Sequence, residues 1–461
     1  MEHSTEMRDD RIGSLLWKFS LPAIVGMLVN ALYNIIDRIF VGHGVGSLGL
    51  AATTVAFPIM LIMMGVSILI GVGATALISI RLGEQKQKDA EKIAGNGAVM
   101  LILLPLTITI IYLLFSDPIL RLFGASPEVF PYARDFTHII MLGSIFGSIS
   151  MGMNNFIRAE GNPRIAMLTQ LIGVFVNIIL NYTFIFKLGL GIKGSALATI
   201  SGQMVSAIWV LNYYWSGRSV VKIRLKNLKL QLPILISIMS IGFAPFAMQI
   251  ANSIQQLLLN KILLAYGGDL ALSAVGIMMS IATLLLMPLL GISQGAQPLI
   301  GYNYGARQYH RVKETLKKAI LAGTCIALVF YLVIHLWPAQ IIGLFSENNT
   351  ALTQLTAHAM LVYFALLPVL AIQIMCSTYF QAVGKPVQST ILSLSRQVLL
   401  FIPLLLILPR FWGIDGVWRT APIADALSVM LTISIIYLEI KKLPDTKLTN
   451  KLTGQPDILS R

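Results

Sequence analysis

The stretch Phe156-Ile-Arg-Ala-Glu-Gly-Asn-Pro163 recurs in the second half of the chain as Tyr379-Phe-Gln-Ala-Val-Gly-Lys-Pro386, with alanine, glycine and proline in register at an offset of 223. Two further pairs of landmarks lie at an offset of 222, namely Gly191-Ile-Lys-Gly194 with Gly413-Ile-Asp-Gly416 and Arg81-Leu-Gly83 with Asn303-Tyr-Gly305. Three landmarks at nearly one offset indicate that the chain consists of two related halves.

Long apolar runs make up most of both halves. Of the 461 residues, 56% are hydrophobic and 12% are charged, whereas roughly a quarter of the residues in a soluble domain are charged. A run of about 20 apolar residues crosses a hydrocarbon core of roughly 30 Å as a helix. We expect twelve transmembrane helices, near residues 15–40, 50–80, 93–115, 132–157, 165–187, 194–215, 234–265, 272–303, 317–338, 352–382, 388–409 and 416–439.

The predicted architecture is an all-α integral membrane protein with six spans in each half. Six is an even number, so both halves enter the membrane from the same side and form parallel repeats. The expected domains are an N-terminal six-helix lobe at 12–216, a polar linker at 217–232, a C-terminal six-helix lobe at 233–440 and a tail at 441–461.

The placement of the basic residues predicts the orientation in the membrane. The formal net charge is +14, and about 24 of the 34 Lys and Arg residues fall in alternate loops and at both termini, as the positive-inside rule expects. Both termini and the linker should therefore be cytoplasmic. The basic loops and termini are expected to form the solvated face of a membrane protein, and nucleic acid is not expected as a partner.

Polar side chains recur at helical spacing in three spans of the first half. Asn30, Asn34 and Asp37 share one face of the first span, because they are four and three residues apart. Spacings of four also join pairs in the fifth and sixth spans, namely Asn177 with Asn181 and Thr199 with Gln203, and Gln170 precedes the first of these pairs by seven residues. Together they predict an oxygen-rich pocket that binds a proton on Asp37 or a hard cation such as sodium. The alternative is that the amides join helices by hydrogen bonds.

The second half is chemically different. An offset of 223 from Asp37 leads to Asn260, so the second lobe lacks this acid. Asn252, Gln256, Met279 and Met287 are candidates for contact with substrate, since amides and adaptable methionines suit an amphipathic ligand. Arg396 and Gln397 lie in the eleventh span, while Arg419 and Asp425 lie six apart in the twelfth, a spacing that leaves their pairing open.

Several stretches together resemble a known family. They are Leu21-Pro22, Asn34-Ile-Ile-Asp-Arg-Ile-Phe-Val-Gly42, Arg158-Ala-Glu-Gly-Asn-Pro163, and Asn177-Ile-Ile-Leu-Asn181 with Ile185-Phe186. Over residues from about 12 to 440 the chain resembles the multidrug and toxic compound extrusion (MATE) transporters, in particular the bacterial DinF/MepA-like branch.

The resemblance implies a V-shaped pair of six-helix bundles in the bacterial inner membrane, which exports amphipathic, often cationic drugs in exchange for a cation. The acid of the family falls on Asp37, and its cation pocket falls on Asn177, Asn181 and Thr199. Asn181 departs from the pattern, because an aspartate is common there. Protons are therefore expected as the coupling ion ahead of sodium, which would bind at Asp37, Asn177 and Thr199.

We expect no cofactor apart from the coupling ion, no enzymatic activity and a monomer in contact with membrane lipid. The predicted substrate contacts are Asn30, Asn34, Gln170, Gln203, Asn252, Gln256, Met279 and Met287. A flippase for lipid-linked precursors is the main alternative, although its anionic cargo would favour a more basic cavity. A membrane-embedded enzyme is the second alternative, but the spans contain neither a His-Glu-x-x-His motif nor paired aspartates.

Overall fold

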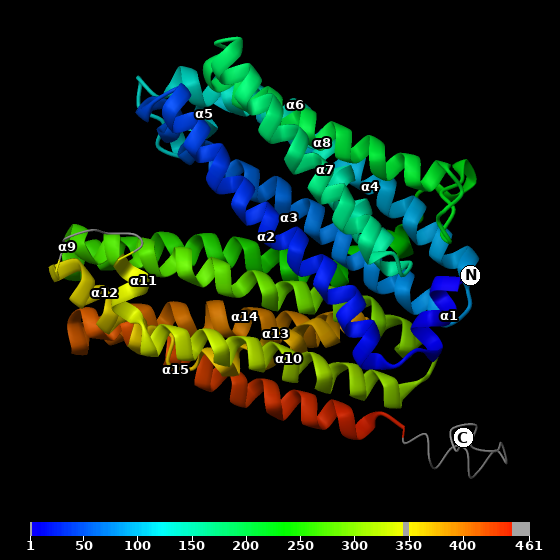
Figure 1. The fold of residues 1–461 in the computed structure, drawn as a ribbon. Helices are drawn as coiled ribbons and strands as arrows, with labels where there is room; N and C mark the ends of the chain where they lie inside the picture. Colours follow the sequence, from blue (N-terminus) through cyan, green and yellow to red (C-terminus); the bar gives the residue numbers. More distant parts are fainter. Residues whose placement is uncertain (1, 344–349, 445–461) are drawn as a thin grey trace. The chain divides into compact units, whose positions relative to one another are not determined.

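A computed structural model of the chain describes residues 2–343 and 350–444, which are almost entirely helical and contain no β-strand (Figure 1). The elements of these residues are α1 (Glu2–Asp9), α2 (Ile12–Gly44), α3 (Ser47–Gly83), α4 (Gln87–Leu114), α5 (Ser116–Leu122), α6 (Phe130–Ala159), α7 (Pro163–Tyr182), the π-helical η1 (Thr183–Lys187), α8 (Gly191–Trp215), the 3-10 turn η2 (Leu225–Asn227), α9 (Leu232–Gly305), α10 (Tyr309–Leu336), α11 (Pro338–Gly343), α12 (Thr350–Tyr363), α13 (Leu367–Ala382), α14 (Pro386–Leu394), the π-helical η3 (Ser395–Phe401) and α15 (Ile402–Lys442).

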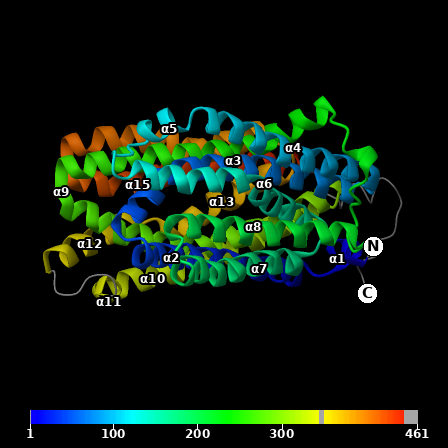
Figure 2. The same cartoon turned by 90° about the horizontal axis from the view of Figure 1, so that it is seen from above.

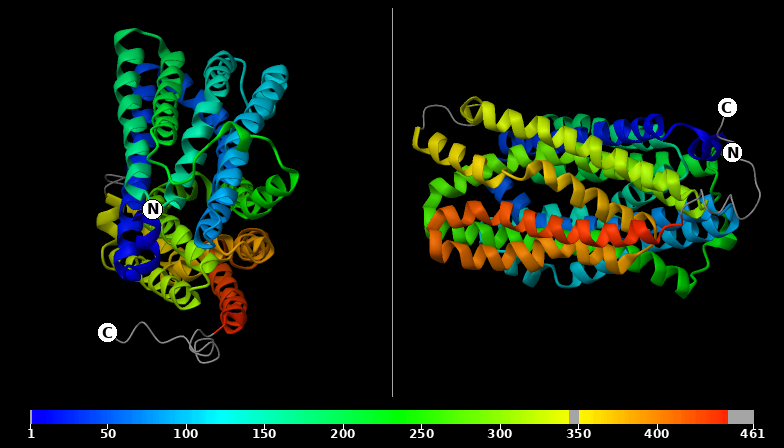
Figure 3. Two further views of the ribbon diagram at one scale, coloured as in Figure 1. Left: turned by 90° about the vertical axis from the view of Figure 1, so that its right-hand side faces the viewer. Right: turned by 90° about the horizontal axis from the view of Figure 1, so that it is seen from below.

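The number of helices that can cross a membrane agrees with the sequence. Within the described residues, ten segments are long and apolar enough, and α12 with α13 forms a further span that bends by 50°. One of the ten, Pro386–Lys442, has 57 residues, far more than the roughly 20 that a single crossing needs. Gly413 interrupts it with φ 54° and ψ −134°, and the chain then runs back along itself, as the orange and red parts of Figure 3 show. The predicted all-α fold is confirmed.

The twofold repeat is visible in the backbone. Eight of the eleven described residues with positive φ occur in pairs at the repeat offset: Gly46 with Gly268, Gln85 with Arg307, Gly161 with Gly384 and Gly191 with Gly413. A positive φ is rare for residues with a side chain, so the Gln85–Arg307 pair in particular, supported by the three glycine pairs, means that corresponding turns have the same geometry. The short helices α5 and α11 also correspond at an offset of 222, although the sequence did not reveal them.

Two compact units make up the described chain. The first contains residues 21–78 and 87–253, and the second contains 2–20, 79–86 and the residues from 254 onward. Helices α2, α3 and α9 each contribute to both units. This division rests on packing, whereas the lobes and linker drawn from the sequence are a division by chain position and stay a prediction.

Each unit has its own apolar core. In the first unit, one cluster surrounds Ala52, Met63 and Tyr112, and another surrounds Val41, Phe136 and Ile185. The cluster of the second unit is larger and includes Phe401 and Trp418, both fully buried. The helices α2, α7 and α8 of the first unit lie next to one another in Figure 2, and they carry the polar residues described below.

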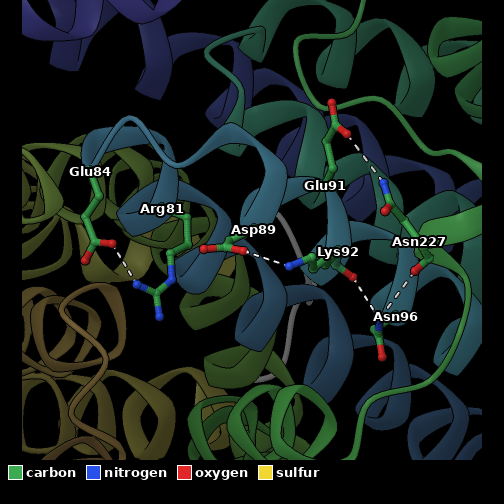
Figure 4. A network of polar contacts seen from close by, with 7 residues as sticks. All are labelled: Arg81, Glu84, Asp89, Glu91, Lys92, Asn96 and Asn227. Atoms are coloured by element: carbon green, nitrogen blue, oxygen red, sulfur yellow. Dashed lines mark hydrogen bonds and ion pairs between the residues drawn. The ribbon is translucent and has the colours of Figure 1, made fainter.

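The segment between α8 and α9 is fastened to the first unit. Asn96 of α4 is fully buried, donates to the carbonyl oxygens of Asn227 (3.4 Å) and Lys229 (3.3 Å), and accepts from the backbone nitrogen of Gln231 (2.8 Å). Asn227 in turn donates to Glu91 at 3.4 Å (Figure 4). A buried amide satisfied in this way orders the segment, which therefore does not act as a free linker.

A second attachment is made by Glu160, which follows α6 in the repeated stretch. Its carboxylate is 1% exposed and accepts hydrogen bonds from Ser219 Oγ (2.8 Å to each oxygen), the backbone nitrogen of Val220 (2.9 Å) and Tyr213 Oη (3.3 Å). Burial outweighs these bonds and raises the pKa of Glu160 to about 7. In the second unit, Lys385 of the equivalent loop pairs with Glu439 near the end of α15. Both repeats thus tie the loop after their fourth span to the end of their sixth.

The raised pKa of Glu160 predicts a pH-dependent stability. A folded-state pKa of about 7, above the ordinary 4.5, gives a contribution that is complete below pH 4.5 and is lost as the pH rises through 7. We expect the free energy of unfolding, measured by SDS titration, to fall by about 1 kcal/mol between pH 6 and pH 8. Glu160→Gln should remove this dependence, and Glu128→Gln, at an exposed position, should retain it. Equal pH slopes in Glu160→Gln and the unsubstituted protein would contradict the assignment.

Candidate functional site

Asp37 lies where α2 meets α7 and α8. Asn181 of α7 donates a hydrogen bond from Nδ2 to Asp37 Oδ1, and Ser195 Oγ of α8 donates to the same oxygen at 3.3 Å. Asn181 and Ser195 are 1% and 0% exposed, while Asp37 is half-buried. An ionisable side chain inside a membrane helix is costly and points to function, so this carboxylate is the centre of the candidate site.

A second layer of polar groups lies one helical turn away. Asn177 Nδ2 is 3.4 Å from Tyr33 Oη and 3.3 Å from Thr199 Oγ1, and the two hydroxyl oxygens are 3.4 Å apart. Each helix contributes to both layers at a spacing of four residues, because one α-helical turn contains 3.6. We call Asp37, Asn181 and Ser195, together with Tyr33, Asn177 and Thr199, the Asp37 cluster.

Two oxygens of the Asp37 cluster lack a partner among the described residues. Asn177 Oδ1 and Asn181 Oδ1 are both buried, and neither accepts a hydrogen bond. Such an unpaired acceptor costs about 1–3 kcal/mol, and most buried polar atoms are paired. Amide, hydroxyl and carboxylate oxygens are the ligands that hard cations prefer, so Asp37, Asn177 and Thr199 have the chemistry to hold sodium, and Asp37 alone has the chemistry to hold a proton.

No group of three His, Cys, Asp or Glu side chains suited to a metal ion occurs in the described part of the chain. A sodium site would therefore depend on neutral oxygens and one carboxylate.

Apolar side chains close one end of the Asp37 cluster. Val41 and Ile185 follow Asp37 and Asn181 by four residues and are 0% and 4% exposed, and Ile192 and Ala196 of α8 belong to the same apolar cluster. Gly44 makes the close packing possible, because a Cβ atom there would lie 2.1 Å from Ile185 Cγ2. Water is thus kept from the carboxylate at the end where α2 terminates and α8 begins.

The structure brings together all four residues assigned to ion coupling from the sequence, Asp37, Asn177, Asn181 and Thr199. The role assigned to them stays a prediction. Sequence reasoning missed Tyr33 and Ser195, although both lie four residues before an assigned residue, Asp37 and Thr199. A search for polar residues at this spacing would have found them.

The predicted substrate contacts are spread over both units. In the first unit, Asn34 donates to Asn30 (2.8 Å to its carbonyl oxygen), while Gln170 and Gln203 pack against Gly26 and Gly147. Asn252 is half-buried and also belongs to the first unit. In the second unit, Gln256 donates to Asn260 at 3.0 Å, Met279 packs against the apolar core and Met287 is half-buried. No structural feature of the described residues distinguishes binding from packing here, so the role of these side chains also stays a prediction.

Sequence spacing left open whether Arg419 pairs with Asp425. In the structure, each of the two has a different partner. Asp425 accepts a hydrogen bond from Arg396 Nε, whereas the guanidinium carbon of Arg419 lies 4.9 Å from the centre of the Trp412 ring. The Arg396–Asp425 pair joins η3 to α15, a contact between helices that helical spacing along one segment does not reveal.

Apolar spans, a twofold parallel repeat and a polar cluster inside the membrane bundle together define a multi-pass membrane protein of the transporter class. Comparison with known proteins gives the family. The MatE family model matches residues 22–183 and again 245–407, more than half of the chain. The protein therefore belongs to the MatE family, and the starts of the two matches, at positions 22 and 245, lie at the repeat offset.

Named relatives agree with this assignment. The chain is 29% identical over 420 residues to the multidrug export protein MepA of Staphylococcus aureus strain N315, covering 91% of this chain and 92% of that protein. MepA of Staphylococcus saprophyticus is 26% identical over the same shares of both chains. A solved outward-facing structure of a multidrug resistance MATE family transporter has a TM-score of 0.90 at 26% identity, covering 96% of this chain and 99% of that one. A MOP superfamily transporter from Pyrococcus furiosus has a TM-score of 0.88 at 26% identity, covering 97% and 99%.

Replacing Asn181 tests the chemistry of the Asp37 cluster. Asn181→Asp places a second carboxylate beside Asp37, and sodium affinity rises with the negative charge of its ligands. At pH 8 we expect sodium to raise the thermal unfolding midpoint of this variant clearly more than that of the unsubstituted protein, because a ligand stabilises the state that binds it. Potassium should have little effect, and Asn181→Leu should not respond to sodium. An Asn181→Asp protein that does not respond to sodium would refute this reading of the cluster.

Proposed function

We propose that the protein is a cation-coupled antiporter of the bacterial cytoplasmic membrane that exports amphipathic, often cationic drugs or toxic metabolites by alternating access. The names of its relatives support export of drugs. The distribution of Lys and Arg supports a cytoplasmic position for both termini. A monomer is the proposed working form, because the Asp37 cluster lies within one unit of a single chain.

The observation that carries the coupling proposal is the single carboxylate of the Asp37 cluster. Asp37 accepts hydrogen bonds from Asn181 and Ser195, an arrangement that suits the ionised form. A protonated Asp37 would need an acceptor, and Asn181 Oδ1 is buried without a partner among the described residues. Turning the amide group over exchanges its donor and acceptor, so Asn181 can serve both protonation states.

Protons are proposed ahead of sodium because the Asp37 cluster contains a single carboxylate. One carboxylate supplies the only negative charge of the cluster, and its other oxygen ligands are neutral. A proton needs one carboxylate oxygen and one acceptor, whereas sodium must exchange its water shell for several oxygens. A second carboxylate at position 181 would strengthen a cation site. The neutral Asn181 therefore favours the proton as the coupling ion.

Exchange then follows from mutually exclusive charge states. An ionised Asp37 stabilises a conformation that holds a cationic substrate, and a protonated Asp37 stabilises the conformation that releases it. The coupling ion can shift this equilibrium only by its difference in affinity for the two conformations. The apolar closure by Val41 and Ile185 supports a proton path that opens from one side at a time.

The coupling proposal is tested by dye efflux from liposomes that contain the purified protein. We expect a proton gradient to drive transport of a fluorescent cationic dye, and Asp37→Asn to reduce this transport at least tenfold, because the asparagine cannot exchange a proton. Asp135→Asn is the matched control, since Asp135 is a half-buried acid of the same unit that pairs with Lys193 at 3.2 Å.

A sodium gradient applied without a proton gradient distinguishes the two ions. Transport driven by sodium alone would replace the proton with sodium in the proposal. An Asp37→Asn protein that transports like the unsubstituted protein would overturn the role of Asp37.

A further inference from the structure

A buried ion pair lies inside the second unit, whereas the Asp37 cluster belongs to the first. Arg396 Nε of η3 donates to Asp425 Oδ1 of α15, and Arg396 Nη1 donates to Gln397 Oε1 at 3.2 Å. The side chains of Arg396 and Asp425 are 16% and 6% exposed. Replacing a buried ion pair by apolar residues of similar volume is often neutral or stabilising. Stability therefore does not by itself explain two charges in this position.

Three irregular helices meet at this pair. Arg396 lies in the π-helical segment η3, and Pro422 lies inside α15, three residues before Asp425. Tyr363 is the last residue of α12, where the tenth span bends by 50°, and its phenol interacts electrostatically with both charges. π-helical turns are frequent at functional sites, and discontinuous membrane helices typically surround binding sites in transporters.

The sequence of the first repeat has no equivalent of this pair. At the repeat offset, Arg396 corresponds to Gly173 or Val174, and Asp425 corresponds to Gly202 or Gln203. The pair is therefore not a by-product of the twofold fold. Conversely, Asp37 corresponds to Asn260. The two carboxylates thus occupy different places in their repeats, the first span for Asp37 and the last span for Asp425.

We infer that Asp425 is a second binding site for the positive charge of an organic cation, and that Arg396 is the internal cation that occupies it until a substrate arrives. This inference rests on the proposed function and names a substrate subsite within it. The guanidinium of Arg396 is itself an organic cation, so the carboxylate already binds this chemistry. Tyr363 adds an aromatic ring, which favours a neighbouring cation.

The π-helical turn gives Arg396 a way to leave. One residue corresponds to roughly 100° of rotation about an α-helix, so a change from π-helical to α-helical register in η3 turns Arg396 away from Asp425. Substrate binding at this site is thus an exchange of one cation for another at Asp425, whose carboxylate stays neutralised before and after the exchange.

Equilibrium binding of tetraphenylphosphonium to the full-length protein in nanodiscs tests the inference. Arg396→Gln removes the internal competitor and should raise the affinity about tenfold or more. Asp425→Asn should lower it to the same extent, and Arg396→Gln/Asp425→Asn should bind like Asp425→Asn. Arg396→Lys retains a cation and should stay close to the unsubstituted protein. The double variant removes both charges, so it tests the site even where one unpaired charge impairs folding. The thermal unfolding midpoint of each variant shows whether that variant is folded.

Tetraphenylborate has the same shape and the opposite charge, so its binding should not increase in Arg396→Gln. If it binds and is lost in Arg396→Gln, the site recognises anions and the inference is wrong. If all variants bind tetraphenylphosphonium like the unsubstituted protein, the ion pair is structural and the inference fails, while dye efflux that depends on Asp37 leaves the proposed function intact. Absence of binding to any variant, together with absence of dye transport, would overturn both.

Discussion

The absence of water from the hydrocarbon core is the constraint on which the rest of the structure depends. Backbone polar groups must be satisfied inside each segment, which makes the described chain helical and confines breaks to a few places. Charges must be paired or hydrogen-bonded, so only a few remain inside the bundles. Asp37 is held by an amide and a hydroxyl, and Asp425 is held by a guanidinium. Each has a partner in or near a π-helical segment: η1 begins two residues after Asn181, and η3 contains Arg396.

Much of the fold could be predicted because its constraints are local in sequence. Apolar length identifies a span, and the repeated glycines have a direct physical reason: Gly161 and Gly384 adopt φ of 96° and 72°, and Pro163 and Pro386 begin the helices that follow. The short helices α5 and α11 were not predicted, because seven or fewer residues carry too little periodicity. The attachment of residues 216–231 by Asn96 and Glu160 was also missed, since it depends on contacts between residues far apart in the sequence.

The distinction between features local in sequence and contacts between distant residues also applies to the candidate site. Asp37, Asn177, Asn181 and Thr199 could be found because polar residues at helical spacing stand out against apolar surroundings. Tyr33 and Ser195 were overlooked, since tyrosine and serine are common in membrane helices and a single one does not indicate a site. The partner of Asp425 could not be predicted, because Arg396 lies 29 residues earlier on another helix and Arg419 lies nearer in sequence. Pairing between helices is a property of packing, which spacing along one helix does not contain.

The two carboxylates differ in what their binding partners must do. Asp37 accepts hydrogen bonds from neutral donors, and two amide oxygens of the Asp37 cluster lack a partner among the described residues, so a cation or proton adds to the cluster without displacing a charge. Asp425 is already neutralised by Arg396, so a cation reaches it only by displacing the guanidinium. Addition changes the local charge by one unit and is therefore sensitive to a proton or sodium gradient. Exchange leaves the Asp425 carboxylate neutralised throughout and is sensitive instead to the size and chemistry of the incoming cation. Under the proposed function, the first kind of site would serve the coupling ion and the second the exported cations, so the asymmetry between the two halves fits a division of these roles.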